Sequence, residues 1–338
     1  MLCLRSLTLF FSVILSVFLL TSCGGPVSSD DPGAQDQTPA PVGSRSGSID
    51  EMCAQPGVVL CQGFDTPSAA TDIGQISAGS ASTPTIDTTV FHDGGGSLRI
   101  DVPSLSAANA GGNWNTSFTP IGEGEELYLH YAIRYDQDYV DVNKDVLTST
   151  GSKQFILWNG SSSCASMEIS HSTLYGRGYP WLYSACGSGG FDIPIANFDY
   201  LIMQGSAEGE GYNCNYHAQS STGLGCPDYQ ADIWWRFYLK LKINKLGGTP
   251  CDGNVVESWW KKGDGPWAQA VNRQSTCLRF NRDASEGYER MMMTAYMTNK
   301  PSNVDHETMS VWYDDLVLST KPLIEGIDSA PVQGWPPE

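Results

Sequence analysis

Apolar and polar residues alternate along much of the chain after residue 58, and this pattern predicts β-strands. The longest alternating run is 126–135, in which Leu127, Leu129, Tyr131 and Ile133 share one face. Shorter runs are rich in β-branched and aromatic residues and end at Gly, Pro, Asn or Asp. We expect strands at 58–64, 85–91, 97–102, 126–135, 153–158, 165–171, 234–244, 255–260, 288–297 and 309–319.

Two of these runs form a predicted hairpin, because 85–91 and 97–102 flank the glycine-rich turn 92–96. The polar segment 203–231 is expected to be an insertion loop. About ten to twelve strands with regularly spaced turns and no internal repeat indicate a β-sandwich. The predicted fold class is all-β, a jelly-roll sandwich in a single domain.

The N-terminus has the pattern of an export signal. Arg5 precedes an apolar run, 7–20, that is shorter than the roughly 20 apolar residues a spanning helix needs. The run ends in Leu20-Thr21-Ser22-Cys23, which resembles the lipobox of bacterial lipoproteins. An ordinary secretory signal that ends near a cysteine is the alternative. We expect an exported lipoprotein, anchored by a lipid on Cys23 to the outer membrane or cell surface.

Composition then divides the chain. Residues 24–50 are rich in Gly, Ser, Pro and Asp, and such a segment buries too little apolar surface to offset its conformational entropy. The expected organisation is a signal peptide at 1–22, a lipidated cysteine and disordered tether at 23–50, the jelly-roll domain at 51–325 and a tail at 326–338. We expect a monomer that contacts the membrane only through its lipid.

Charge and cysteine content restrict the partners and the compartment. The formal net charge is −18, which disfavours nucleic acid, whose binding depends on Lys and Arg at phosphates. Eight cysteines remain after Cys3 and Cys23, and an even number in an exported chain indicates disulfides that staple loops. Sequence does not choose among 105 pairings. Neighbour pairing is our expectation, which joins Cys53 to Cys61, Cys164 to Cys186, Cys214 to Cys226 and Cys251 to Cys277.

Four segments carry a family resemblance: Phe64-Asp65, the turn region 86–100, the strand 127–134 and the motif Val311-Trp312-Tyr313-Asp314-Asp315-Leu316. Together they resemble the concanavalin-A-like jelly rolls of polysaccharide lyases, in particular the glucuronan lyase group and related fungal cellulose-induced secreted proteins. The resemblance implies a structural Ca²⁺ held by Asp65, Asp93, the Gly96 carbonyl and Asp314. Carboxylates and carbonyls suit calcium, although these residues could equally be ordinary turn carboxylates.

The resemblance also directs attention to lyase chemistry. A β-elimination lyase must neutralise a uronate carboxylate, take the C5 proton and protonate the leaving oxygen. The candidate catalytic residues are Gln154, His171, Arg177 and Tyr296. Each has an ordinary structural alternative, and Glu168 places negative charge where a uronate would lie. The three-motif signature of alginate lyases is absent, as are the carboxylate pattern of jelly-roll glucanases and a Gly-x-Ser-x-Gly elbow.

Aromatic residues supply a second functional signal, because sugar rings stack on aromatic faces. The candidate carbohydrate-binding residues are Tyr175, Tyr179, Trp181, Trp235 and Trp259. Adjacent pairs such as Trp259-Trp260 send one ring into the core and the other outward. Three hypotheses follow: a surface-anchored lyase that acts on a uronate-containing polysaccharide, a non-catalytic polysaccharide-binding lipoprotein, and a structural or adhesive surface protein. A basic cleft with Lys153, His171 and Arg177 would favour the lyase.

Overall fold

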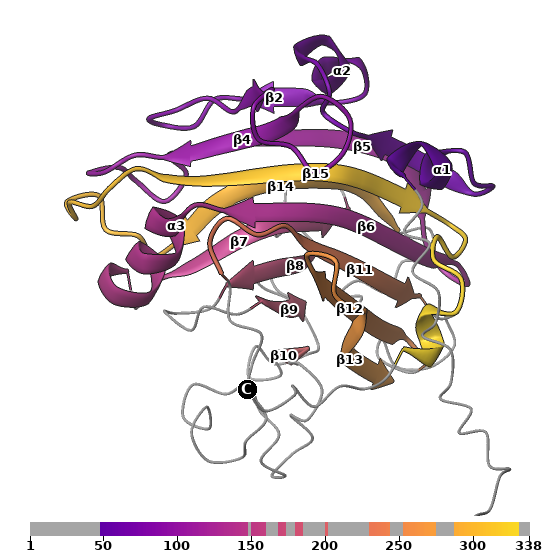
Figure 1. Cartoon of the computed structure of the whole chain (residues 1–338). Coiled ribbons are helices and arrows are strands. Elements are labelled where there is room, and N and C mark those ends of the chain that lie inside the picture. Colours follow the sequence, from indigo (N-terminus) through magenta and orange to yellow (C-terminus); the bar gives the residue numbers. More distant parts are fainter. Residues whose placement is uncertain are drawn as a thin grey trace, which may run out of the picture. The chain divides into compact units, whose positions relative to one another are not determined.

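The computed structural model describes residues 48–147, 150–159, 168–173, 180–184, 200–201, 230–243, 253–274 and 287–330. These residues form two stacked antiparallel sheets, so the predicted all-β jelly-roll sandwich is confirmed (Figure 1). Short helices join the strands, namely α1 (Ile49–Cys53), α2 (Pro67–Asp72), α3 (Gln137–Asp141), a π-helical turn (Val142–Val146) and a 3₁₀ turn (Ile327–Ser329). In this described part, no helix has the length and apolar character needed to cross a membrane.

The first sheet has eight strands, in the order β13-β12-β11-β6-β15-β4-β3, with β1 also paired to β15. Its strands are β1 (Val58–Gln62), β3 (Thr85–Asp87), β4 (Ser97–Val102), β6 (Glu126–Tyr135), β11 (Trp235–Lys242), β12 (Val255–Lys262), β13 (Ala268–Gln274) and β15 (Met309–Ser319). The β1–β15 pairing places the first strand of the domain beside the last.

The second sheet has seven strands, in the order β10-β9-β8-β7-β14-β5-β2. Its strands are β2 (Gln75–Ser77), β5 (Asn113–Ile121), β7 (Gly151–Trp158), β8 (Glu168–Thr173), β9 (Pro180–Ser184), β10 (Tyr200–Leu201) and β14 (Tyr288–Thr298). The strands β7, β14 and β5 are direct neighbours in this sheet, although paired residues such as Asn113 and Thr294 are 181 positions apart in the sequence. This sheet carries the candidate site described below.

The predicted hairpin is confirmed, since β3 pairs antiparallel with β4, but its first strand is shorter than predicted. The prediction of 85–91 is wrong after Asp87. The Asp87 carboxylate accepts hydrogen bonds from the backbone amides of Thr89 (2.8 Å) and Val90 (3.3 Å), and this local turn ends the strand. Sequence reasoning also missed β13 and β5, and polar residues occupy most positions of β5.

The main core lies between the two sheets. Leu127, Leu129, Tyr131 and Ile133 of β6 are all at most 1% exposed, as the alternation predicted, and the Tyr131 ring lies edge-on to Phe155 of β7. A second, smaller apolar cluster lies on the opposite face of the eight-stranded sheet. There α1 and the segment 323–330 cover Tyr128, Tyr238, Trp259 and Val317. One sheet is therefore buried on both faces over part of its area.

This second cluster extends the domain at both ends. Ile49 begins α1 and is buried, and Ile327 is buried in the same cluster, although sequence reasoning assigned them to the tether and the tail. Cys53 of α1 forms a disulfide with Cys61 of β1, as expected from neighbour pairing. The other six cysteines, Cys164, Cys186, Cys214, Cys226, Cys251 and Cys277, and the lipidation candidate Cys23 lie outside the described residues.

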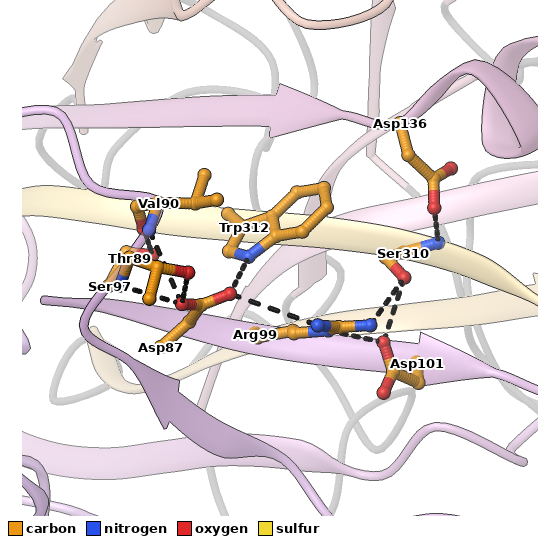
Figure 2. A network of polar contacts seen from close by, with 9 residues as sticks. All are labelled: Asp87, Thr89, Val90, Ser97, Arg99, Asp101, Asp136, Ser310 and Trp312. Carbon is orange, nitrogen blue, oxygen red and sulfur yellow. Dashed lines mark hydrogen bonds and ion pairs between the residues drawn. The ribbon is translucent and has the colours of Figure 1, made fainter.

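Polar contacts join the strands at one edge of the eight-stranded sheet (Figure 2). The Trp312 indole N–H of β15 donates to Asp87 of β3 (2.9 Å), and Arg99 of β4 bonds Asp101 (2.7 Å). Burial raises the pKa of Asp87, but hydrogen bonds from Thr89 and Trp312 outweigh it and bring the pKa to about 2. The charged side chains Asp87, Arg99 and Asp101 at this edge of the sheet are therefore bonded to other residues of the domain.

Candidate functional site

Tyr296 lies on the outer face of the seven-stranded sheet. On β14 its neighbours Ala295 and Met297 are 2% and 0% exposed and belong to the core, whereas Tyr296 is 38% exposed. The alternation along the strand had predicted this phase, and the structure confirms it. The phenol is therefore the candidate catalytic group that can meet a bound polymer directly.

Lys153 of β7 is the cross-strand partner of Tyr296. Residues directly opposite each other in an antiparallel pair project on the same face, with Cβ atoms about 4.5–5.5 Å apart. Lys153 is half-buried, and its neighbour Ser152 points into the core, where it is hydrogen-bonded by the Tyr139 hydroxyl. A phenol and an ammonium group are thus side by side on the outer face.

Gln154 occupies a different environment from the one expected of a substrate-contacting amide. It lies where the β7–β14 and β7–β8 registers both shift, between Lys153 and Phe155. It is 0% exposed. An irregularity of this kind re-aims side chains. In this structure the Gln154 side chain has no exposed surface on which to meet a substrate.

The strand β14 itself, and β5 and β2 on the side of β14 away from β7, add polar groups that sequence reasoning missed. Arg290 of β14 is half-buried, and Met292 is the cross-strand partner of Asn115 of β5. The Asn115 amide nitrogen donates to Asn113 (2.8 Å) and to Ser77 of β2 (3.2 Å). The alternation of polar residues in Asn113-Trp114-Asn115 was the signal that could have found this strand.

The remaining catalytic and aromatic candidates are placed only by backbone or not at all. In β8, His171 pairs with Phe155, and in β9, Trp181 pairs with Ser172. Arg177, Tyr175 and Tyr179 lie outside the described residues. The predicted set Gln154, His171, Arg177 and Tyr296 therefore stays a prediction as a catalytic group.

Two tryptophans proposed as sugar platforms are interior residues in this structure. Trp235 is 0% exposed and packs in the main core, 5.4 Å from Trp260 between ring centroids. Trp259 is 1% exposed, because α1 and the segment around Leu323 cover it. The period-two alternation correctly predicted that Trp259 and Trp260 lie on opposite faces of β12, but both faces of the strand are covered there. Neither Trp235 nor Trp259 offers a ring face to a sugar here.

The residues proposed for calcium come together around the glycine-rich turn. The Gly95 amide donates to Asp65 (2.6 Å), and the amides of His92 (2.7 Å) and Asp93 (3.3 Å) donate to Asp314. A side chain at Gly96 would meet the carbonyl oxygens of Phe64 and Asp65 at 2.9 and 3.1 Å, so the turn packs closely on that segment.

The predicted calcium ligands suit the ion in their chemistry but only partly in their arrangement. The oxygen chemistry suits calcium. However, the carboxylates face backbone amides, and among the described residues no three His, Cys, Asp or Glu side chains are grouped closely enough to hold a metal. Burial and the adjacent Asp315 carboxylate raise the pKa of Asp314. The set fits calcium only in part, and calcium binding stays a prediction.

Comparisons with known proteins agree with the fold. No protein-family model and no curated protein matches this chain. A solved alginate lyase from Aplysia kurodai is similar at 14% identity and TM-score 0.47, over 70% of this chain and 87% of that one. An endo-β-1,4-glucuronan lyase from Trichoderma reesei is similar at 13% identity and TM-score 0.40, over 73% and 87%. An endo-1,3-β-glucanase from Streptomyces sioyaensis is similar at 14% and 0.42, over 79% and 98%.

These solved structures are jelly-roll enzymes with different reactions, and the TM-scores are all below 0.5. Because one fold can host many reactions, the chemistry of this chain depends on its own residues.

Proposed function

We propose that the chain is a polysaccharide lyase that cleaves a uronate-containing glycan on the outer face of its seven-stranded sheet. The observation that carries the proposal is the cross-strand pair of Tyr296 and Lys153 on that face. A phenol can move a proton and an ammonium group can hold a carboxylate, which are the two abilities that β-elimination requires.

The reaction divides into proton removal and proton return. A base takes the proton from C5 of the uronate, the electron pair forms the C4–C5 double bond, and the C4–O4 bond breaks. The departing oxygen then takes a proton. In this proposal Lys153 neutralises the uronate carboxylate, which makes the C5 proton more acidic. The Tyr296 oxygen takes the C5 proton, and the resulting hydroxyl then donates it to the departing O4. Arg290 lies on the same strand six residues before Tyr296, about 20 Å away at the rise of a β-strand, so its positive charge would act on a uronate several sugar units along the glycan.

A binding module is the second candidate function, because the same face would hold a glycan without cleaving it. Asn113 and Asn115 present amides on β5 beside Met292 and Thr294 of β14. Side-chain amides and an apolar thioether suit sugar hydroxyls and ring faces. A structural or adhesive surface protein is the third candidate. Such a protein would neither cleave nor bind a glycan.

We propose further that the protein is exported and held at the membrane by a lipid on Cys23. The apolar run and the lipobox-like sequence support this proposal. Metabolic labelling with a radioactive fatty acid tests it: the label should enter the wild-type protein and be lost in Cys23→Ser.

The lyase proposal is tested with the full chain and a panel of polyuronates, including polyglucuronate, alginate and polygalacturonate. Ultraviolet absorbance follows the unsaturated product. We expect activity on one substrate class, and at least a hundredfold loss in Tyr296→Phe and Lys153→Met, in the range general acid–base groups contribute. Lys242→Met, which changes an exposed lysine of the other sheet, is the matched control.

Each result separates the candidates. No unsaturated product on any polyuronate would refute the lyase. Retention of the chain in a glycan-containing affinity gel, lost in Tyr296→Ala, would then establish the binding module. Neither product nor retention would favour the structural candidate.

A further inference from the structure

A cavity of about 930 Å³ opens on the outer face of the eight-stranded sheet, which the proposed lyase site does not use. Its walls come from α1, the turn at His92, the strands β6, β11 and β15, and the segment 321–325. Pockets for small ligands have volumes of roughly 300–1,000 Å³. The cavity is thus large enough for a short oligosaccharide or another molecule of that size.

Three ionisable side chains at its base are buried and belong to three neighbouring strands. His130 of β6, Arg236 of β11 and Asp315 of β15 are 2%, 6% and 3% exposed. His92 from the turn holds one Asp315 oxygen at 2.5 Å through Nδ1, and His130 Nδ1 lies 2.9 Å from the Asp315 carbonyl. Burial lowers the pKa of His130 to about 4, so this ring is uncharged at neutral pH.

The pairing of these groups is incomplete among the described residues. Arg236 donates through Nη2 to the Gly263 carbonyl (3.0 Å), while its Nε has no acceptor in the described part of the chain. The second oxygen of Asp315, Oδ1, also has no donor there. Both residues line the cavity, and a buried polar atom without a partner costs about 1–3 kcal/mol, which a partner from a ligand or ordered water would recover.

The charges of the lining decide which ligand fits. The formally charged lining residues are Glu51, Asp93, Asp315, Glu325, Arg236 and Lys321. The four carboxylates outnumber the two cations, so the lining is negative on balance and opposes an anionic ligand. A hydroxyl group donates to a carboxylate and accepts from a guanidinium. A neutral, hydroxyl-rich molecule is the class that suits both.

Trp267 supplies the apolar wall that such a molecule needs. It is half-buried, lines the cavity and lies edge-on to His130 with ring centroids 6.2 Å apart. Sugars present one apolar ring face and a rim of hydroxyls. We propose that this cavity is a second glycan site, which binds a neutral sugar unit on Trp267 with its hydroxyls toward Asp315 and Arg236. The site lies on the opposite sheet from Tyr296 and is independent of the lyase proposal.

Titration calorimetry of the full chain tests this site with neutral hexasaccharides, namely cellohexaose, laminarihexaose and mannohexaose. Oligoglucuronate and oligogalacturonate serve as charged probes. We expect a neutral probe to bind, and Trp267→Ala to weaken its affinity by about tenfold or more. Asp315→Asn should weaken it as well. It is a mild second variant, because Asp315 has a positive φ of 50°, which asparagine tolerates.

Matched controls separate this site from the other sheet. Trp234 is also half-buried and lies edge-on to His92 with ring centroids 5.6 Å apart, but it does not line the cavity, so Trp234→Ala should keep the affinity. Tyr296→Phe should keep it too. The inference is overturned if no neutral hexasaccharide binds, or if Trp267→Ala and Asp315→Asn both leave binding unchanged. Failure of the lyase assay alone does not affect it.

Discussion

Replacing Trp259 by alanine distinguishes a packing role from a sugar-binding role for this ring. Trp259 is 1% exposed and lies against Tyr238, with ring centroids 5.7 Å apart. Truncating a buried Trp to Ala costs about 3–5 kcal/mol. The indole N–H has no acceptor among the described residues, and removing that buried donor returns about 1 kcal/mol. We therefore expect Trp259→Ala to lower the free energy of unfolding by about 2–4 kcal/mol.

The assay is urea unfolding at fixed pH with the disulfides intact. The urea concentration at the unfolding midpoint should fall. The slope of the free energy against urea concentration should stay the same, because the variant exposes nearly the same surface on unfolding. Phe91→Ala is the control. Phe91 is 41% exposed, so its loss should change stability by at most about 0.5 kcal/mol.

One result would refute this reasoning. If Trp259→Ala unfolds like the wild type but loses glycan binding, the ring is a sugar platform and the cover of α1 and Leu323 opens in solution. If stability falls and the affinity for neutral or charged glycans is retained, Trp259 is a packing residue, as the structure places it.

Three further predictions concern the stability of the fold. Gly74→Ala would place a Cβ 2.3 Å from the Trp114 ring and should cost about 1–3 kcal/mol in urea unfolding, whereas Gly95→Ala, whose nearest contact is 3.9 Å, should cost far less. Burial raises the pKa of Asp136 to about 6, so its contribution to stability is present below about pH 4 and lost as pH rises through 6; Asp136→Asn should flatten this part of the midpoint–pH curve. If calcium binds at the Gly94 turn, adding it to chelator-treated protein should raise the melting temperature, and Asp65→Asn should reduce the rise.

Local sequence patterns determined a large part of this protein. Alternation along β6 identified which side chains enter the core, and the same rule put Tyr296 outside and Met297 inside. The hairpin of β3 and β4 and the disulfide between Cys53 and Cys61 also followed from spacing. These features depend on residues close in the chain, whose geometry is set by backbone period and turn chemistry.

Only the tertiary structure decided what covers each face and which distant strands meet. Alternation assigns Trp259 to a face of β12, but it cannot show that α1 and residues 323–327 bury that face. The pairing of Lys153 with Tyr296 joins residues 143 positions apart in the sequence, and the cavity at Asp315 brings together three strands, a turn and the C-terminal segment. Such contacts depend on how elements pack across the whole domain, which no local period specifies.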